Sequence, residues 1–309
     1  MSAPTPSGTE TPACLLCGKP QRLLYPSNVP RGKAIHSDEV ACTSSHLSLH
    51  DDIYLCDACG LARSAPTVDS DELAELYGAV EDPAYWVSEE ERRASFREAL
   101  EEIERYRLPG EAGRRVLEIG SAVGLFLEEA RHRGWEATGI EPSRWASEQA
   151  RRRGLEIYTV TLEDYHPAGK TFDAVALWDV LEHLTDPVAA LRRIRELLAP
   201  GGLVALTTVN IAGAGARIFR GRWPWLMRMH LHYFTPQSLR ELLRREGFET
   251  LRLTTQPKVL KLGYVLERAR GLFGPLASAG RWAAERLRLA SRPVKVNLGD
   301  ILLVVARKK

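Results

Sequence analysis

The segment that most constrains this chain is residues 116–124, which read VLEIGSAVG. An apolar run gives way to a turn of small residues bounded by Gly120 and Gly124, and helix-like sequence begins at Leu125. This order predicts a strand, a tight turn and a helix. Glycine permits positive φ and a close ligand approach, and the unpaired amides at a helix start favour an anionic or polar group. We expect a nucleotide-like ligand above this turn.

An acidic residue ends the next apolar run. Glu141 follows residues 137–140, and Pro142 comes next. A carboxylate at the tip of a second strand can accept hydrogen bonds from both hydroxyls of a ribose. An NAD-linked oxidoreductase is one protein class that binds a nucleotide at such a turn. The phosphate-binding turn of that class reads Gly-x-Gly-x-x-Gly, whereas the glycines of this turn are Gly120 and Gly124 alone, so we treat it as the weaker interpretation.

Strand-like and helix-like segments alternate through the middle of the chain. Strands are predicted at 115–119, 136–140, 155–159, 173–178 and 203–208, and helices at 125–133, 143–153 and 187–198. Helices between apolar strands indicate right-handed crossovers and a parallel, doubly wound sheet. We therefore predict a Rossmann-like α/β fold, in which ligands bind beyond the carboxyl ends of the strands.

Length and charge narrow the class of protein. With 309 residues, 44% of them hydrophobic, the chain can bury a sizeable core. The 42 basic and 40 acidic residues nearly cancel, so the charge does not favour nucleic acid. No apolar run reaches the roughly 18 residues that a membrane span needs. Residues 1–12, rich in Pro, Ser and Thr, predict a disordered leader and not a signal peptide, and we expect a cytoplasmic protein.

Four of the five cysteines form two Cys-x-x-Cys pairs, Cys14 with Cys17 and Cys56 with Cys59, and a glycine follows each pair. In a reducing compartment such pairs favour a metal over disulfides, and four thiolates make a closed tetrahedral zinc site. We predict a structural zinc in a module over residues 13–65. A redox role is the weaker alternative, because neither pair lies at a thioredoxin-like turn.

The gap between the pairs contains further residues of ligand type: His36, Cys42, His46 and His50. Each is either a substitute ligand or an ordinary loop residue, and we expect Cys42 to take no part. After the module, residues 66–110 are expected to link it to the sheet. Here Ser88 and Glu91 predict a capping box at the start of a covering helix, whose buried face is Phe96, Leu100, Ile103 and Tyr106.

Four successive motifs, VLEIGSAVG, GIEPS, FDAVALWDVLEHLTDP and LLAPGGLVALTT, resemble those of class I S-adenosylmethionine-dependent methyltransferases. The resemblance covers roughly residues 116–248 and implies a seven-stranded sheet whose last strand, near 300–306, is an antiparallel edge. The middle glycine of the usual motif is Ala122 here, which we expect to cost little unless that position needs positive φ. The implied cofactor-binding residues are Glu118, Gly120, Ser121, Ala122, Gly124, Glu141, Pro142, Glu163, Asp164, Trp178 and Asp179.

The resemblance also assigns roles within S-adenosylmethionine. It implies that the turn at 120–124 holds the methionine end and that Glu141 holds the ribose. Glu163 or Asp164 is expected near the adenine amino group, and residues 178–179 beside the sulfonium.

The front of the chain is similar to the zinc-binding leader of bacterial methyltransferases acting on sugars and natural products. The similarity rests on Cys-x-x-Cys-Gly-Leu, which ends at Leu61, and on Glu-Leu-x-x-x-Tyr, which ends at Tyr77. Some of those enzymes are C-methyltransferases with a further large C-terminal domain, which does not follow here. We therefore favour O-methylation of a sugar, glycolipid or natural product, with C- or N-methylation as the alternative. A non-catalytic scaffold, whose zinc module recruits a partner, is a second alternative.

Methyl transfer to a hydroxyl requires alignment and removal of a proton. His183 is the leading candidate base, because its unperturbed pKa lies near neutrality; alternatively it supports the loop. In the segment MHLHYFTP, His232 and Tyr233 are candidates for the acceptor side. His232 is otherwise a core residue with a hydrogen-bonded ring, and His230 is otherwise solvated. Thr235 and Pro236 predict a helix start.

Two insertions in the methyltransferase domain, which we place at 111–309, are expected to set specificity. The first, within 211–235, mixes arginines with tryptophans, and the second spans about 257–298. Residues 258–295 carry nine basic residues against Glu267 and Glu285. A basic amphipathic lid suits an anionic acceptor, or peripheral contact with an anionic membrane to reach a lipid-linked one. The alternative is an ordinary solvated helix face, and RNA is a weaker candidate.

Overall fold

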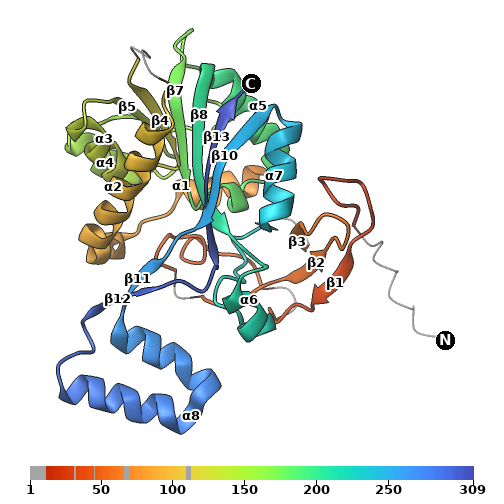
Figure 1. The fold of residues 1–309 in the computed structure, drawn as a ribbon, viewed down its shortest axis with the longest axis vertical. Coiled ribbons are helices and arrows are strands. Elements are labelled where there is room, and N and C mark those ends of the chain that lie inside the picture. Colours follow the sequence, from red (N-terminus) through yellow and green to blue (C-terminus); the bar gives the residue numbers. More distant parts are fainter. Residues whose placement is uncertain (1–11, 31–32, 45, 66–69, 109–112) are drawn as a thin grey trace.

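A seven-stranded sheet forms the centre of the larger part of the molecule (Figure 1). The computed structural model describes residues 12–30, 33–44, 46–65, 70–108 and 113–309. The predicted leader, apart from Pro12, lies outside these ranges, as does the segment 109–112 that follows the predicted covering helix. No helix in the described ranges has both the length and the apolar composition to cross a membrane.

The strand order in this sheet is β10-β13-β8-β7-β4-β5-β6. The strands are β4 (Arg115–Ile119), β5 (Glu136–Ile140), β6 (Glu156–Tyr158), β7 (Phe172–Trp178), β8 (Leu198–Val209), β10 (Phe248–Thr255) and β13 (Ile301–Lys308). The five from β6 to β8 are parallel, which confirms the predicted Rossmann-like α/β class. Strand β13 is antiparallel as predicted, but it lies between β8 and β10. Its predicted place at the edge is therefore wrong, because β10 covers that side.

Helices cover both faces of the sheet (Figure 1). They are α2 (Glu89–Arg105), α3 (Leu125–His132) and α4 (Arg144–Arg152) on one face, and α5 (Pro187–Leu197) and α7 (Pro236–Arg245) on the other. Side chains alternate across β4, so that Val116 packs in the cluster of α2 and α3, whereas Leu117 packs in the cluster of α5 and α7. The sheet therefore separates two apolar cores.

Helix α2 buries the face that its sequence predicts, with Leu100 and Ile103 fully buried. The predicted capping box is wrong. Ser88 precedes the helix with φ −118° and ψ 32°, and its side chain accepts no hydrogen bond from the helix amides. The cause is the 3-10 turn η1 (Pro83–Ser88), which runs directly into α2 and keeps Ser88 out of the extended conformation that a cap needs. Its hydroxyl instead accepts a hydrogen bond from Arg92 Nε, 3.1 Å away.

The front of the chain forms a second, four-stranded antiparallel sheet. Its order is β1 (Arg22–Tyr25), β2 (Asp52–Leu55), β3 (Ala62–Ala65) and β9 (His232–Tyr233). The last of these strands comes from the segment after β8, not from the front of the chain, and pairs Tyr233 with Ala62 and His232 with Arg63. One sheet thus joins the cysteine-containing module to the segment that the sequence analysis predicted to border the acceptor. Helix α1 (Ser70–Gly78) then leads back to the body.

The two predicted insertions form separate structures. The first contains α6 (Ala214–Phe219) and the 3-10 turn η3 (Arg220–Arg222). The second is a two-stranded ribbon, β11 (Lys258–Lys261) with β12 (Pro293–Val296), that carries α8 (Leu262–Arg286). Helix α8 bends back on itself at Gly274, beside Pro275, and stands apart from the seven-stranded sheet (Figure 1). The ribbon leads into β13 where Ile301 pairs with Val209, so it emerges at the carboxyl edge of β8.

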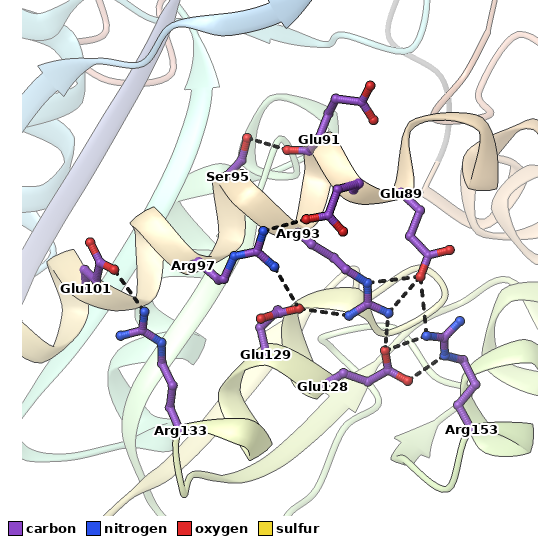
Figure 2. Close-up of polar contacts among 11 residues, drawn as sticks. Glu89, Glu91, Arg93, Ser95, Arg97, Glu101, Glu128, Glu129, Arg133 and Arg153 are labelled. Atoms are coloured by element: carbon purple, nitrogen blue, oxygen red, sulfur yellow. Dashed lines mark hydrogen bonds and ion pairs between the residues drawn. The ribbon is translucent and has the colours of Figure 1, made fainter. Parts of the chain in front are cut away.

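A network of ion pairs fastens α2 to α3 (Figure 2). Arg93 is 13% exposed and lies 2.8 Å from Glu89 Oε1, 2.5 Å from Glu128 Oε2 and 3.0 Å from Glu129 Oε1. Arg153, beyond α4, bonds both oxygens of Glu128. Although burial opposes ionisation, Arg153 and Arg93 lower the pKa of Glu128. These largely buried charges depend on one another.

Replacing Arg93 by Ala should lower the free energy of unfolding by about 2 kcal/mol, because Glu128 and Glu129 lose a cation where water reaches them poorly. Arg152→Ala is the matched control, since Arg152 and its partner Glu148 are both more than half exposed. The control should change stability by less than about 0.5 kcal/mol. Urea unfolding measures the free energy of unfolding of both variants. Equal losses of stability would show that the ion-pair network stabilises the fold no more than an exposed ion pair does.

Candidate active site

The glycine turn between β4 and α3 is fixed by backbone conformation and packing. Gly120 and Gly124 have φ of 69° and 83°, in the left-handed region. A Cβ on Gly120 would lie 2.7 Å from Val180 Cγ2, and one on Gly124 would collide with the side chain of Leu155. Protein side chains therefore occupy the space that the missing Cβ atoms leave, so both positions need glycine before any ligand binds.

Ala122 departs from the usual glycine at a position that does need positive φ. Its φ is 47°, in the left-handed region, where a side chain costs roughly 1–2 kcal/mol. The amide of Ala122 donates to Glu141 Oε2 at 2.8 Å, which helps to hold this conformation. The condition under which the sequence analysis expected a cost, positive φ at this position, is therefore met.

Glu141 ties the tip of β5 to the glycine turn. One oxygen accepts the Ala122 amide, and the other accepts the amide of Ser143 at 2.9 Å. Burial raises the pKa of this carboxyl, and the two amides oppose the rise. Each carboxylate oxygen has a second lone pair, so Glu141 retains the capacity to accept hydroxyl hydrogens.

Three buried polar atoms around this turn have no hydrogen-bond partner among the described residues. They are Glu118 Oε2, Ser121 Oγ and Trp178 Nε1. Burial raises the pKa of Glu118 well above its usual range, and the charge of Glu141 adds to this. A buried polar atom without a partner costs about 1–3 kcal/mol, so a group of them marks a place for a polar ligand. The donor and acceptor set fits the amino acid and ribose parts of S-adenosylmethionine.

The tip of β7 is strained. Asp179 has φ 55°, its amide donates to Thr207 Oγ1 at 2.9 Å, and the Thr207 hydroxyl donates to Asp179 Oδ1 at 2.8 Å. Strain of this kind is common at functional sites. Glu163 and Asp164 are exposed beyond β6, where Asp164 accepts a hydrogen bond from Thr161, and Pro142 is half-buried beside Glu141. Their expected roles toward the nucleoside stay predictions.

His183 lies on the 3-10 turn η2 (Leu181–His183), after β7. Its Nδ1 lies 3.0 Å from the Met229 carbonyl and 2.9 Å from the Tyr77 hydroxyl. A carbonyl only accepts, so Nδ1 carries the hydrogen and Nε2 keeps its lone pair. Burial lowers the pKa of His183 to about 4. This is below the unperturbed value on which its choice as a base rested, so His183 is a neutral hydrogen-bond acceptor at pH 7, and its role as a base stays a prediction.

His230, expected to be either solvated or part of the site, is buried against His183. The two rings are 4.8 Å apart, and His230 Nδ1 lies 2.7 Å from the Trp225 carbonyl. Glu182, His183 and His230 each present one potential ligand atom within 4.8 Å of the others. The carboxylate of Glu182 accepts a hydrogen bond from Thr208 Oγ1 at 2.8 Å. This group can orient a hydroxyl or hold a divalent cation, and methyl transfer requires only the first.

His232 and Tyr233 make backbone contacts that stabilise their own segment. His232 Nε2 lies 3.3 Å from the Thr185 carbonyl, and the Tyr233 hydroxyl donates to the Met227 carbonyl at 3.2 Å. Both residues are buried. These contacts match the core-packing alternative for His232, and catalytic roles for the two residues stay predictions.

The four paired cysteines come together. Cys14 Sγ is 3.5 Å from Cys59 Sγ, Cys17 Sγ is 3.4 Å from Cys56 Sγ, and all four sulfurs lie within 4.8 Å of one another. Tetrahedral zinc at a Zn–S distance of about 2.3 Å needs sulfurs about 3.8 Å apart, which this cluster fits. Among the described residues, the cluster includes none of the four other candidate ligands: His36, Cys42, His46 and His50.

Two residues that sequence reasoning did not place in the site lie beside it. Tyr77 contacts His183, and the sequence singled it out only as the last residue of Glu-Leu-x-x-x-Tyr, without a place in the site. Cys42 keeps solvent-accessible surface, although burial raises the pKa of its thiol to about 12. The charges of Glu141 and Asp179 act on this thiol. Cys42 therefore lies near the carboxyl edge of the sheet, where no sequence signal placed it.

Comparison with known proteins identifies the class. The methyltransferase domain family matches residues 89–253, more than half of the chain, so this protein belongs to the S-adenosylmethionine-dependent methyltransferases. It is 35% identical over 156 residues to a ubiquinone biosynthesis O-methyltransferase of Ruegeria pomeroyi, covering 45% of this chain and 61% of that protein. A namesake from Alkalilimnicola ehrlichii is 37% identical over 110 residues, 33% of this chain and 44% of that protein. The chain thus spans about three fifths or less of these relatives.

Solved structures agree on the fold. The plantazolicin methyltransferase BpumL, solved with a desmethyl plantazolicin analogue and S-adenosylhomocysteine, superposes with a TM-score of 0.51 at 15% identity, covering 77% of this chain and 95% of that one. A putative methyltransferase of Haloferax volcanii, in complex with the activator Trm112, gives a TM-score of 0.50 at 17% identity, covering 72% and 94%. At these identities the likeness shows the methyltransferase fold alone.

The backbone at Ala122 gives a test of stability. Replacing Ala122 by Gly should raise the free energy of unfolding by about 1 kcal/mol, since glycine adopts the left-handed conformation without a Cβ penalty. Ala94→Gly, inside α2, should lower it by a similar amount. Thermal and urea unfolding of the two variants should therefore shift in opposite directions. A loss of stability in both would contradict the strained backbone at Ala122.

The buried His232 predicts a specific pH dependence. Burial lowers its pKa from 6.5 to about 4, so the unfolded chain binds more protons between these values. The stabilising contribution is complete above pH 6.5 and is lost as the pH falls toward 4. His232→Gln keeps an N–H for the Thr185 carbonyl and cannot titrate. Between pH 7.5 and 4.5 the wild type should lose about 2–3 kcal/mol more stability than this variant in urea unfolding; equal losses would contradict the assignment.

Proposed function

We propose that this protein transfers a methyl group from S-adenosylmethionine to a hydroxyl oxygen of a small molecule. The observation that carries the proposal is the set of buried polar atoms without partners, Glu118 Oε2, Ser121 Oγ and Trp178 Nε1, around a glycine turn that Glu141 braces. The sulfonium of S-adenosylmethionine makes its methyl group electrophilic. The protein must therefore bind and align the two substrates and exclude water from between them, and it has less need to activate the methyl group.

On the donor side, the residues divide the work by position. Glu141 accepts the ribose hydroxyls with the lone pairs that the amides of Ala122 and Ser143 leave open. Ser121 and Glu118 face the amino acid end, where a buried carboxyl and hydroxyl can pair with an ammonium group. Trp178 offers its indole N–H at the tip of β7.

On the acceptor side, His183 presents the Nε2 lone pair to a hydroxyl. Its low pKa makes it a weak base, so it orients the hydroxyl along the line of attack and takes up the proton only as the oxygen becomes positively charged during transfer. The Tyr77 hydroxyl and the Met229 carbonyl hold the ring in place. This arrangement suits an oxygen acceptor, and the O-methyltransferase relatives support the same choice.

The remaining acceptor candidates follow from this. A sugar, glycolipid or natural product with a free hydroxyl meets the requirement, and C- or N-methylation is the alternative for the same domain.

We also propose that the four-cysteine cluster binds a structural zinc. Although burial opposes ionisation, hydrogen bonds from the backbone of Cys59 and from the Cys17 thiol lower the pKa of Cys56 to about 7. By contrast, burial raises the pKa of Cys14 and of Cys59. A cation is needed to hold four thiolates this close.

Calorimetric titration tests the donor site. The zinc-loaded protein should bind S-adenosylmethionine, and Glu141→Gln should weaken binding by at least about tenfold, because one acceptor for the ribose becomes a donor. Glu148→Gln, on the exposed face of α4, should bind as the wild type does. Circular dichroism of each variant checks that the fold is retained. Failure of the folded wild type to bind would contradict the enzyme and favour the scaffold alternative, in which the zinc module alone acts by recruiting a partner.

A further inference from the structure

The chain between the two cysteine pairs packs against the acceptor side of the site. An apolar cluster combines three of its residues with the segment before β9 and with the end of α1: Ile35, Val40, Ala41, Met227, Met229 and Val80. Tyr77, the partner of His183, packs against the same cluster. We call the segment 33–44 the excursion loop. It packs against the residues that contact His183 and His230.

Arg228 fastens the excursion loop to the acceptor segment. The side chain is 10% exposed, and it donates to the Ala34 carbonyl at 2.9 Å and to the Lys33 carbonyl at 3.2 Å. It also pairs with Asp51 Oδ2 at 3.3 Å, next to β2. Arg228 thus connects the segment before β9 to three residues of the chain between the two cysteine pairs.

The excursion loop also reaches over the donor side. Cys42 is exposed and lies close enough to Glu141 and Asp179 for their charges to act on its thiol. The next residue, Thr43, bonds through its amide and hydroxyl to the carboxylate of Asp82, which precedes η1. The loop therefore contacts both the segment before β9 and the residue that precedes η1.

The cysteine cluster holds both ends of this chain segment and packs on the acceptor segment. The Cys17 end and the Cys56 end meet at the four sulfurs. A Cβ on Gly60, in the second knuckle, would lie 2.8 Å from Thr235 Oγ1, the cap of α7. Strand β3 then pairs with β9. The cluster thus contacts the acceptor half directly, whereas the ligand-facing turn of the donor half is braced by Glu141 from β5.

We propose that a metal ion at the four-cysteine cluster closes the acceptor half of the active site, around His183, His230 and β9, by holding the excursion loop and β9 together. The donor half, which is the glycine turn with Glu141, then binds S-adenosylmethionine even without the metal. The inference rests on the proposed function and deepens it, because it makes the zinc module a wall of the site. The excursion loop then packs over the acceptor half, and Arg228 is a positioning residue.

Removal of zinc with a chelator tests the clamp, with three readouts that need no acceptor. The dissociation constant for S-adenosylmethionine should change by less than about threefold. Alkylation of Cys42 by iodoacetamide, followed by peptide mass spectrometry, should become at least about tenfold faster, since the packing that raises the pKa of its thiol loosens and more thiolate forms. Amide hydrogen exchange should accelerate in residues 227–234 and stay unchanged in β4 and β5.

Arg228→Ala tests the same claim with the metal in place. It should retain zinc and bind S-adenosylmethionine as the wild type does, yet show the faster Cys42 alkylation and the faster exchange at 227–234. Arg192→Ala, an exposed arginine on α5, is the matched control and should match the wild type in every readout.

The outcomes separate the two proposals. Unchanged alkylation and exchange in both the metal-free protein and Arg228→Ala, with intact binding of S-adenosylmethionine, would overturn the clamp and leave the methyltransferase proposal standing. Loss of binding and of global protection on metal removal would also overturn it, because the donor half would not stand alone. Absence of binding in the zinc-loaded wild type would contradict the proposed function itself.

Discussion

The pairing of β3 with β9 is the contact on which the architecture depends. It places two residues of the acceptor segment, His232 and Tyr233, into a sheet whose other strands come from the front of the chain. A methyltransferase sheet alone would leave the segment after β8 as a long loop over its carboxyl edge, and long loops have many conformations of similar energy. Backbone hydrogen bonds to β3 select one of them. The acceptor side is therefore built jointly by two parts of the chain.

Burial then determines the chemistry at this edge. The chain around α1 packs at this edge, where Tyr77 contacts His183 and the Val80 carbonyl accepts a hydrogen bond from Ser143. Burial raises the pKa of Glu118 and Glu141 and lowers that of His183. The resulting site favours neutral rings and carboxyls paired with backbone amides. Such a site suits a cationic ligand, because a positive charge favours the ionised form of the carboxyls whose pKa burial raises.

Much of this fold is predictable from sequence, for physical reasons. Strands β4 and β5 match their predicted bounds, since each apolar run begins at a charged residue and ends before glycine or glutamate. The place of β13 in the sheet was not predictable, because an apolar strand gives no sign of whether another strand will cover its outer side. The meeting of the four paired cysteines in one cluster was predictable, because the Cys-x-x-Cys spacing is typical of a metal site.

The site itself was less predictable. Residues on the glycine turn and at the tip of β5 follow from local sequence, because the turn that presents them is local. Tyr77 and Cys42 reach the site only through tertiary packing of the front of the chain, which no spacing rule describes. The depressed pKa of His183 has the same origin, since its burial comes from residues far away in the sequence.

A crystal structure of the zinc-loaded protein with S-adenosylhomocysteine is the most direct test of the central claim, that the glycine turn and the front of the chain enclose one active site. The account predicts both ribose hydroxyls on the Glu141 carboxylate, a metal peak at the four cysteine sulfurs, and the product sulfur facing the side where His183 and Cys42 lie. A nucleoside bound away from Glu141, or a sulfur that faces away from the excursion loop, would contradict it.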